Sequence, residues 1–150
     1  FLSAQEIDAI EASDNASGTK PEAQSILAKL VTELVHSEEG LTAATRISGA
    51  LFSGDITALT GDDLQQLELD GLPCSSIAAD SAGIVKVLVA TELAKSNKMA
   101  REFIGNNAVS VNGQLVTEPD FQLSSEKALQ RQYFVLKRGK KLFHLVKLAN

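Results

Sequence analysis

The sequence predicts an α+β protein, in which an N-terminal all-helical domain is followed by a small domain of two helices and a β-hairpin sheet. Apolar residues recur at three- and four-residue spacing through the first half of the 150 residues. Two further helical patterns follow, and apolar and polar residues then alternate around an Asn-Gly and an Arg-Gly pair. We expect a helical domain at residues 1–79, a linker at residues 80–83 and an α+β domain at residues 84–150.

The first half is expected to form a helical bundle. Ser3 and Glu6 have the spacing of a capping box, which predicts that a short helix begins there. A second helical pattern begins at Pro21, is broken at Ser37 and continues to near Gly54. Its first part carries an apolar stripe that we expect to be buried, formed by Ile26, Leu27, Leu30, Val31, Leu34 and Val35.

A further short helix is expected after the long pattern, because Thr60 and Asp63 have the spacing of another capping box.

No catalytic or metal-binding residue is predicted. His36 and Glu39 are close in sequence, but no other potential metal ligand accompanies them, so a polar contact at a helix end is expected. Cys74 lacks the partners of a nucleophile and is expected to be a small packing residue in a linker.

The second half begins with two helices. Ser81 and Ser96 are the expected N-caps of these helices. On the second helix Lys98 and Arg101 are three residues apart and share a face, with Asn97 one turn before Arg101. Their donors should therefore point together away from the core.

Two hairpins are expected after these helices. Asn112–Gly113 between alternating apolar residues is a strong signal for a tight turn, because both residues tolerate positive φ. Two further strands should flank Arg138–Gly139, where arginine fits the first turn position poorly and leaves the register open. In the simplest register Lys137 lies opposite Lys140, and like charges so paired destabilise a sheet.

Charge divides the chain in two. Residues 1–82 hold three basic and fourteen acidic side chains, whereas residues 83–150 hold eleven basic and five acidic ones. A basic half suggests a nucleic-acid or other anionic partner, and lysine and arginine suit phosphate oxygens. The alternative is that lysines on an edge strand guard against aggregation. The candidate RNA-binding residues are Lys86, Lys95, Asn97, Lys98, Arg101, Lys137, Arg138, Lys140 and Lys141.

The stretch "AKSNKMAREFIGNNAVSVNG" resembles the small RNA-binding domain first described in the fourth protein of the small ribosomal subunit, over residues 84–148. Asn97 departs from that pattern, because the family has an arginine there that would contact a phosphate; the adjacent Lys98 can take over this contact. The matching residues are Ser96, Ala100, Arg101, Ile104, Val111, Asn112 and Gly113.

The stretch "LVHSEEGLTAATRISGALFSGD", residues 34–55, resembles the helical segment that precedes such a domain in bacterial tyrosyl-tRNA synthetases. The resemblance implies the C-terminal half of an enzyme, a fragment that grips the anticodon stem and long variable arm of tyrosine tRNA. The "HIGH" and "KMSKS" signatures are absent, so ATP and tyrosine would be used by a preceding catalytic domain, with no cofactor in this fragment. The resemblance also implies a homodimeric parent, whose C-terminal fragment could be monomeric.

The compartment expected is the cytoplasm. No apolar run approaches the roughly 18–20 residues of a membrane span, no charged-then-apolar leader is seen, and a single cysteine cannot form an internal disulfide. Two alternative functions remain open. The chain could be the RNA-binding module of another RNA-directed enzyme or ribosome-associated factor, or an adaptor whose basic tip meets an acidic protein.

Overall fold

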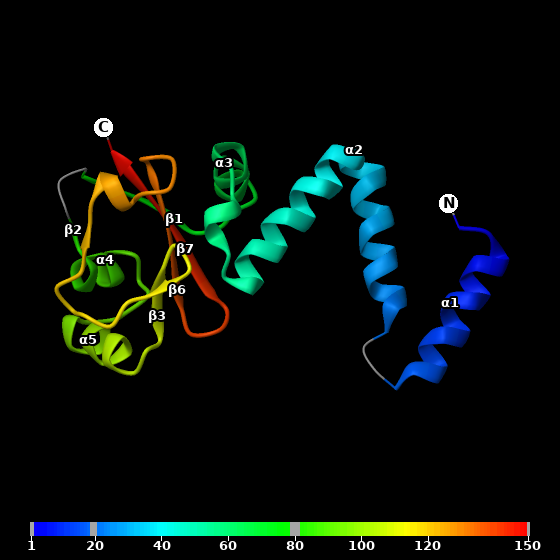
Figure 1. The fold of residues 1–150 in the computed structure, drawn as a ribbon, viewed down its shortest axis with the longest axis horizontal. Helices are drawn as coiled ribbons and strands as arrows, with labels where there is room; N and C mark the ends of the chain where they lie inside the picture. The colour runs from blue at the N-terminus through cyan, green and yellow to red at the C-terminus, as the bar shows by residue number, and fades with distance from the viewer. Residues whose placement is uncertain (1, 19–20, 79–81, 150) are drawn as a thin grey trace. The chain divides into compact units, whose positions relative to one another are not determined.

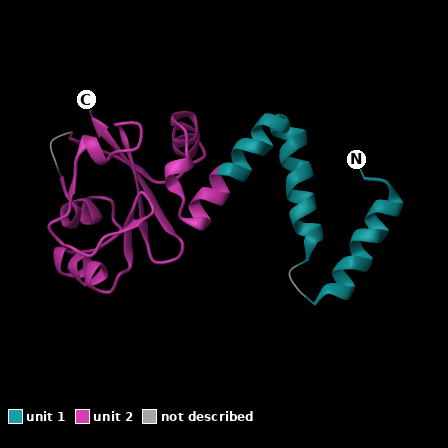
Figure 2. Ribbon diagram, in the orientation of Figure 1, with its two compact units in different colours: residues 1–46 teal, residues 47–150 magenta. Residues whose placement is uncertain are grey.

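The computed structural model describes residues 2–18, 21–78 and 82–149. The chain divides into two compact units, residues 1–46 and residues 47–150 (Figure 2). The division falls within the long helix α2 (Glu22–Ser53). The α+β class predicted from the sequence is confirmed, with helices in both units and a mixed sheet in the second (Figure 1).

Unit 1 is formed by α1 (Ala4–Ser17) and the first part of α2. The predicted capping box is present: the Ser3 backbone N–H donates to Glu6 Oε2 at 2.8 Å, and the Glu6 N–H donates to Ser3 Oγ at 3.4 Å. The carboxylate of Asp14 caps α2, because it accepts the backbone N–H groups of Glu22 at 2.6 Å and Ala23 at 3.0 Å. The predicted break in α2 is confirmed at Ser37, where φ is 68°.

The apolar stripe of α2 is not buried as predicted. Leu27 is 63%, Leu34 70% and Val35 65% exposed. In the described part of unit 1, α1 and α2 are the only elements, and two helices cannot cover each other's whole apolar surface. An open apolar hollow of about 330 Å³ therefore remains, lined by Leu2, Ile7, Leu27, Leu30, Val31 and Leu34.

Unit 2 is built around a five-stranded sheet with the strand order β1-β7-β6-β3-β4, in which β1 runs parallel to β7 and the other pairs are antiparallel. The strands of this sheet are β1 (Cys74–Ala78), β3 (Val109–Val111), β4 (Gln114–Leu115), β6 (Tyr133–Arg138) and β7 (Leu142–Ala149). A smaller sheet pairs β2 (Ala82–Gly83) with β5 (Gln122–Leu123). The helices are η1 (Ile56–Ala58), α3 (Gly61–Leu69), α4 (Ile84–Ala90), α5 (Asn97–Gly105) and η2 (Ser125–Lys127).

Both faces of the five-stranded sheet are covered, by α4 and α5 on one side and by α3 on the other (Figure 1). Strand β6 explains this arrangement, because it begins with four consecutive apolar residues that point alternately to the two faces. Phe134 and Leu136 pack in the core with α4 and α5. Tyr133 and Val135 pack in a second core with the end of α2 and with α3.

The domain boundary expected at residues 80–83 differs from the observed division. The end of α2 and α3 share the second core with the sheet, and β1 supplies an edge strand, so these segments belong to unit 2. Cys74, expected in a linker, is the first residue of β1 and packs against that core. Ser81, the expected N-cap, lies outside the described residues, as does residue 80; α4 begins after Gly83.

The two hairpins differ in how well they were predicted. The Asn112–Gly113 turn is confirmed, with φ values of 51° and 81° and with Val111 paired to Gln114. In the terminal hairpin Arg138 pairs with Leu142, and Lys137 pairs with Phe143 rather than lying opposite Lys140. This pairing leaves a loop of three residues, 139–141. The positive φ of 62° falls on Gly139, which tolerates it, and not on the preceding arginine.

Candidate nucleic-acid interface

The first group of candidate residues gathers at the start of α5. Ser96 caps this helix as predicted, since its Oγ accepts the Met99 backbone N–H at 3.2 Å. An open hollow of about 310 Å³ lies beside it, lined mainly by polar groups and including Lys86, Asn97 and Arg101. The unpaired backbone N–H groups of a helix start carry partial positive charge, which favours an anion at this position. A phosphate oxygen suits this combination of donors.

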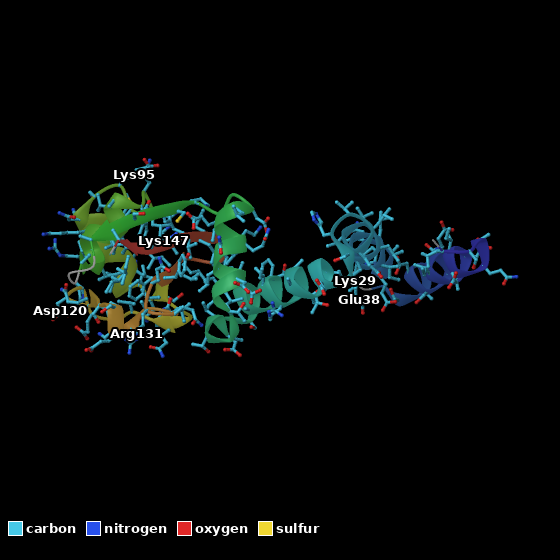
Figure 3. All side chains as sticks on the ribbon, turned by 90° about the horizontal axis from the view of Figure 1, so that it is seen from above. Lys29, Glu38, Lys95, Asp120, Arg131 and Lys147 are labelled. Carbon is cyan, nitrogen blue, oxygen red and sulfur yellow. The ribbon has the colours of Figure 1, made fainter. Side chains whose placement is uncertain are left out.

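Lys98 and Lys95 lie close to this group in the sequence. Both are exposed, Lys98 on α5 and Lys95 just before its cap, where Figure 3 shows the Lys95 side chain at the surface of unit 2. The hollow is also lined by Pro119 and Gln122, which the sequence did not single out. The pairing of β5 with β2 and the hydrogen bond from the Ile84 backbone N–H to the Phe121 carbonyl, at 2.9 Å, bring that segment to α4, and no local pattern predicts these contacts.

The second group lies at the tip of the terminal hairpin. Lys140 and Lys141 are exposed in its loop, whereas Lys137 and Arg138 at the end of β6 are half-buried. The Lys137 Nζ lies 5.1 Å from the centre of the Phe143 ring, and the Arg138 guanidinium carbon lies 4.8 Å from the centre of the Phe103 ring. These cation–π contacts hold the two side chains in place and leave donors at their edges.

The contact between Arg138 and Phe103 joins the hairpin to α5. The hairpin is fixed there by two further contacts, since the Gly139 backbone N–H donates to the Ala108 carbonyl at 2.8 Å and Arg138 pairs with Val109. The tip thus lies against the C-terminal end of α5, while Asn97 lies at the N-terminal end. The described residues record no direct contact between the cations of the two groups.

The candidate cations have no carboxylate partner among the residues that the structure describes. Lys147 behaves differently, because its Nζ lies 3.5 Å from a carboxylate oxygen of Glu68 on α3. A hydrogen bond with Tyr133 and the charge of Glu68 raise the pKa of Lys147. This lysine therefore joins α3 to the sheet, whereas the candidate cations are available to an external anion.

Other kinds of site find little support in the described residues. No group of three or more His, Cys, Asp or Glu side chains there is placed to hold a metal ion. Burial raises the pKa of the Cys74 thiol and the charge of Glu68 raises it further, so the thiolate needed for nucleophilic attack is disfavoured. Within residues 2–18, 21–78 and 82–149, no helix combines the length and apolarity of a membrane span.

Comparisons with known proteins agree with the fold. A family model described as the tyrosine–tRNA ligase SYY-like C-terminal domain matches residues 63–146. The chain is 58% identical over 145 residues to a tyrosine–tRNA ligase of Aliivibrio fischeri (strain MJ11) and 51% identical over 146 residues to one of Laribacter hongkongensis. Each match covers 97% of this chain and 34% of the relative, so the chain spans about a third of their length.

A solved structure is also similar. The solution structure of a tyrosyl-tRNA synthetase C-terminal domain is 35% identical to this chain, with a TM-score of 0.53. The similarity covers all of that domain and 67% of this chain.

Proposed function

This chain belongs to the family of tyrosine–tRNA ligase SYY-like C-terminal domains, and on that premise we propose that it is the tRNA-binding C-terminal part of a tyrosine–tRNA ligase. The observation that carries the proposal is that the candidate cations are left without carboxylate partners among the described residues. A surface with unpaired cations favours an anionic partner, and the names of the relatives suggest tyrosine tRNA as that partner.

In this proposal the two cationic groups bind the RNA backbone. Lys86, Asn97, Lys98 and Arg101 would hold phosphates at the start of α5, and Lys140 with Lys141 would hold phosphates at the hairpin tip, with Lys95, Lys137 and Arg138 adding further contacts. Phosphate contacts position an RNA but carry little sequence information. Selection of tyrosine tRNA would therefore depend on the shape of its anticodon stem and long variable arm, and on contacts to individual bases.

The exposed apolar face of unit 1 fits a second part of the proposal. The relatives extend far beyond the matched segment, because only 34% of their length is covered. We assign the apolar hollow between α1 and α2 to packing against the preceding part of the parent enzyme. Exposed leucines such as Leu27 and Leu34 would then be buried in the full-length protein, as apolar surfaces of this size usually are.

The parent would be an ATP-dependent ligase that joins tyrosine to its tRNA in the cytoplasm, and a homodimer through its catalytic part. The present chain would position the tRNA and would have no ligase activity alone. Domains at residues 1–79 and 84–150 remain the proposed functional division between the helical platform and the RNA-binding domain.

The proposal is tested by titrating the chain into labelled tyrosine tRNA over a series of salt concentrations, with other tRNAs as competitors. About four to six phosphate contacts should give a slope of roughly −3 to −5 when log affinity is plotted against log salt. Tyrosine tRNA should compete more strongly than tRNAs with a short variable arm. Absence of saturable binding at low salt would reject the proposal and favour the adaptor.

A further inference from the structure

A third hollow, of about 320 Å³, lies in unit 2 between β1, the segment after α4 and the start of β7. Its walls are partly apolar, with Pro73, Leu93 and Leu142, and partly polar, with Ser75, Glu92 and His144. Ligand sites commonly combine an apolar lining with a few polar groups and begin at about 300 Å³. The size and the lining therefore suit a small ligand that has both apolar and hydrogen-bonding groups.

The His144 side chain is a polar group in this hollow that can form a hydrogen bond with a ligand. Its Nε2 lies 2.8 Å from Ser75 Oγ, and its other ring nitrogen has no hydrogen-bond partner among the described residues. Burial lowers the pKa of His144, although the charge of Glu92 partly opposes this. The ring is therefore mostly neutral near pH 7, and its free nitrogen can serve one hydrogen bond to a ligand.

Glu92 is the second polar group of this kind. It follows the last turn of α4 with φ at 59°, the position and conformation where glycine is usually found. A residue with a side chain is strained there, so a carboxylate at this point has a cost that glycine would avoid. Strain of this kind is typical of functional positions. Within the described residues, no lysine or arginine neutralises this carboxylate.

The hollow adjoins the cationic hairpin. Leu142 and Phe143, which line it, directly follow Lys140 and Lys141 in the loop. An RNA backbone held by these two lysines would therefore run past the mouth of the hollow. Sequence-specific recognition of RNA mostly uses unstacked bases whose edges are read by hydrogen bonds.

We propose that this hollow binds one unstacked nucleobase of the RNA, and that it prefers guanine. The preference follows from Glu92, because guanine presents two adjacent donors, N1–H and the N2 amino group, to a single carboxylate. Adenine and uracil cannot offer this pair of donors. The His144–Ser75 pair would serve the acceptor side of the ring, at O6 or N7. This proposal rests on the RNA-binding role proposed above and adds the base contact that phosphate binding lacks.

The test uses the intact chain and three mononucleotides that differ only in the base edge: GMP, IMP and AMP. Binding is followed by changes in the NMR shifts of backbone amides and of the His144 ring. GMP should bind about tenfold more tightly than AMP, and IMP, which keeps N1–H but lacks the amino group, should lie between them. The largest shifts should fall at Ser75, at residues 90–93 and at residues 142–144.

Two variants of one residue separate a binding role from a structural one. Glu92→Gln should abolish the difference between GMP and AMP, because the amide no longer accepts two donors. Glu92→Gly should abolish it too, while the melting temperature stays the same or rises as the backbone strain is removed. Glu118→Gln, which changes an exposed carboxylate outside the hollow, should leave the preference intact.

Equal affinities for GMP and AMP, shifts confined to Lys86 and Arg101, or an unchanged preference in both Glu92 variants would each overturn the guanine site. These outcomes differ from failure of the tRNA-binding role. Loss of the salt-dependent binding of whole tRNA would reject that role even if GMP bound in the hollow.

Discussion

Removing the charge of Lys140 and Lys141 provides the sharpest perturbation of the proposed interface. Both side chains are exposed in the three-residue loop of the terminal hairpin, and neither has an ion-pair partner among the described residues. Replacement of both by serine should remove two phosphate contacts and leave the packing of the sheet untouched.

The expected loss follows from counterion release. Each phosphate contact contributes about 0.7 to 0.9 to the slope of log affinity against log salt, so the double variant should have a slope shallower by roughly 1.4 to 1.8. With 1 M salt as the reference, each phosphate contact then raises the affinity by about 0.7 log units at 150 mM salt. The two together should lower the affinity for tyrosine tRNA about twentyfold at 150 mM salt, and about a hundredfold at 50 mM.

Fluorescence anisotropy with labelled tRNA at five or more salt concentrations measures both the slope and the affinity. The matched control is Lys127→Ser/Arg131→Ser, which removes the same charge from exposed positions outside the predicted site; Arg131 is labelled in Figure 3. Surface substitutions away from packing contacts change stability by about 0.5 kcal/mol or less, so the Lys140/Lys141 variant should melt near the wild-type temperature. The control is matched in charge, and it also loses the contact of Lys127 Nζ with the Phe121 ring, 4.5 Å from the ring centre. Equal losses of affinity in the two variants would refute a localised site, and a large fall in melting temperature of the first would favour a structural role for the lysines.

Three further predictions concern the fold and its neighbours. Gly113→Ala should lower the free energy of unfolding by at least about 2 kcal/mol in a denaturant titration, because φ is 81° and a Cβ atom would collide with the Gly54 carbonyl oxygen. An unchanged free energy of unfolding would contradict the observed packing of Gly113 against Gly54. A fragment of residues 47–150 should give a dispersed NMR spectrum and one of residues 84–150 should not, since the shorter fragment lacks β1 and the helices that cover the second core. Equal dispersion in the two spectra would instead support a folded domain at residues 84–150. Burial lowers the pKa of His144 below its ordinary value of about 6.5, so the stability that the neutral ring provides is complete above about pH 6.5 and is lost as the pH falls. The difference in melting temperature between wild type and His144→Asn should therefore shrink between about pH 7.5 and 5.5, and a constant difference would argue against a neutral buried ring.

Local signals in the sequence predicted the local structure well. The capping residues Ser3, Thr60 and Ser96 begin helices as expected, and the break at Ser37 and the turn at Asn112–Gly113 are present. Each depends on the preference of one or two residues for a particular backbone conformation or hydrogen bond. Such preferences are visible without knowledge of the rest of the chain.

The differences from expectation arose where structure depends on distant segments. The boundary near residue 80 was expected from the change in charge and composition, whereas the compact units divide between residues 46 and 47, because surface charge does not decide which segments share a core. The apolar residues at both Val135 and Leu136 in β6 were a signal that each face of the sheet needs a cover, and α3 provides the second one. The stripe on α2 was expected to be buried because its pattern is amphipathic, yet the pattern does not say which chain supplies the partner surface.

In the candidate site, too, the features that depend on local sequence were predicted and those that depend on distant segments were not. Amino-acid type and spacing were sufficient to place Lys98 and Arg101 on exposed positions of one helix. The contact of Arg138 with Phe103 could not be predicted, because it depends on the register of the terminal hairpin and on how the sheet meets α5. The same holds for the hollow around His144, whose walls come from three separate segments.

Protection of lysines from acetylation by bound tyrosine tRNA, read residue by residue by mass spectrometry, tests the central claim most directly. Lys98 on α5 and Lys140 and Lys141 in the hairpin loop should be protected together, with a common dependence on tRNA concentration, while Lys29 and Lys127 should react as in the free protein. Protection of only one of the two groups, or equal protection of all five lysines, would contradict a single RNA-binding surface formed by α5 and the terminal hairpin.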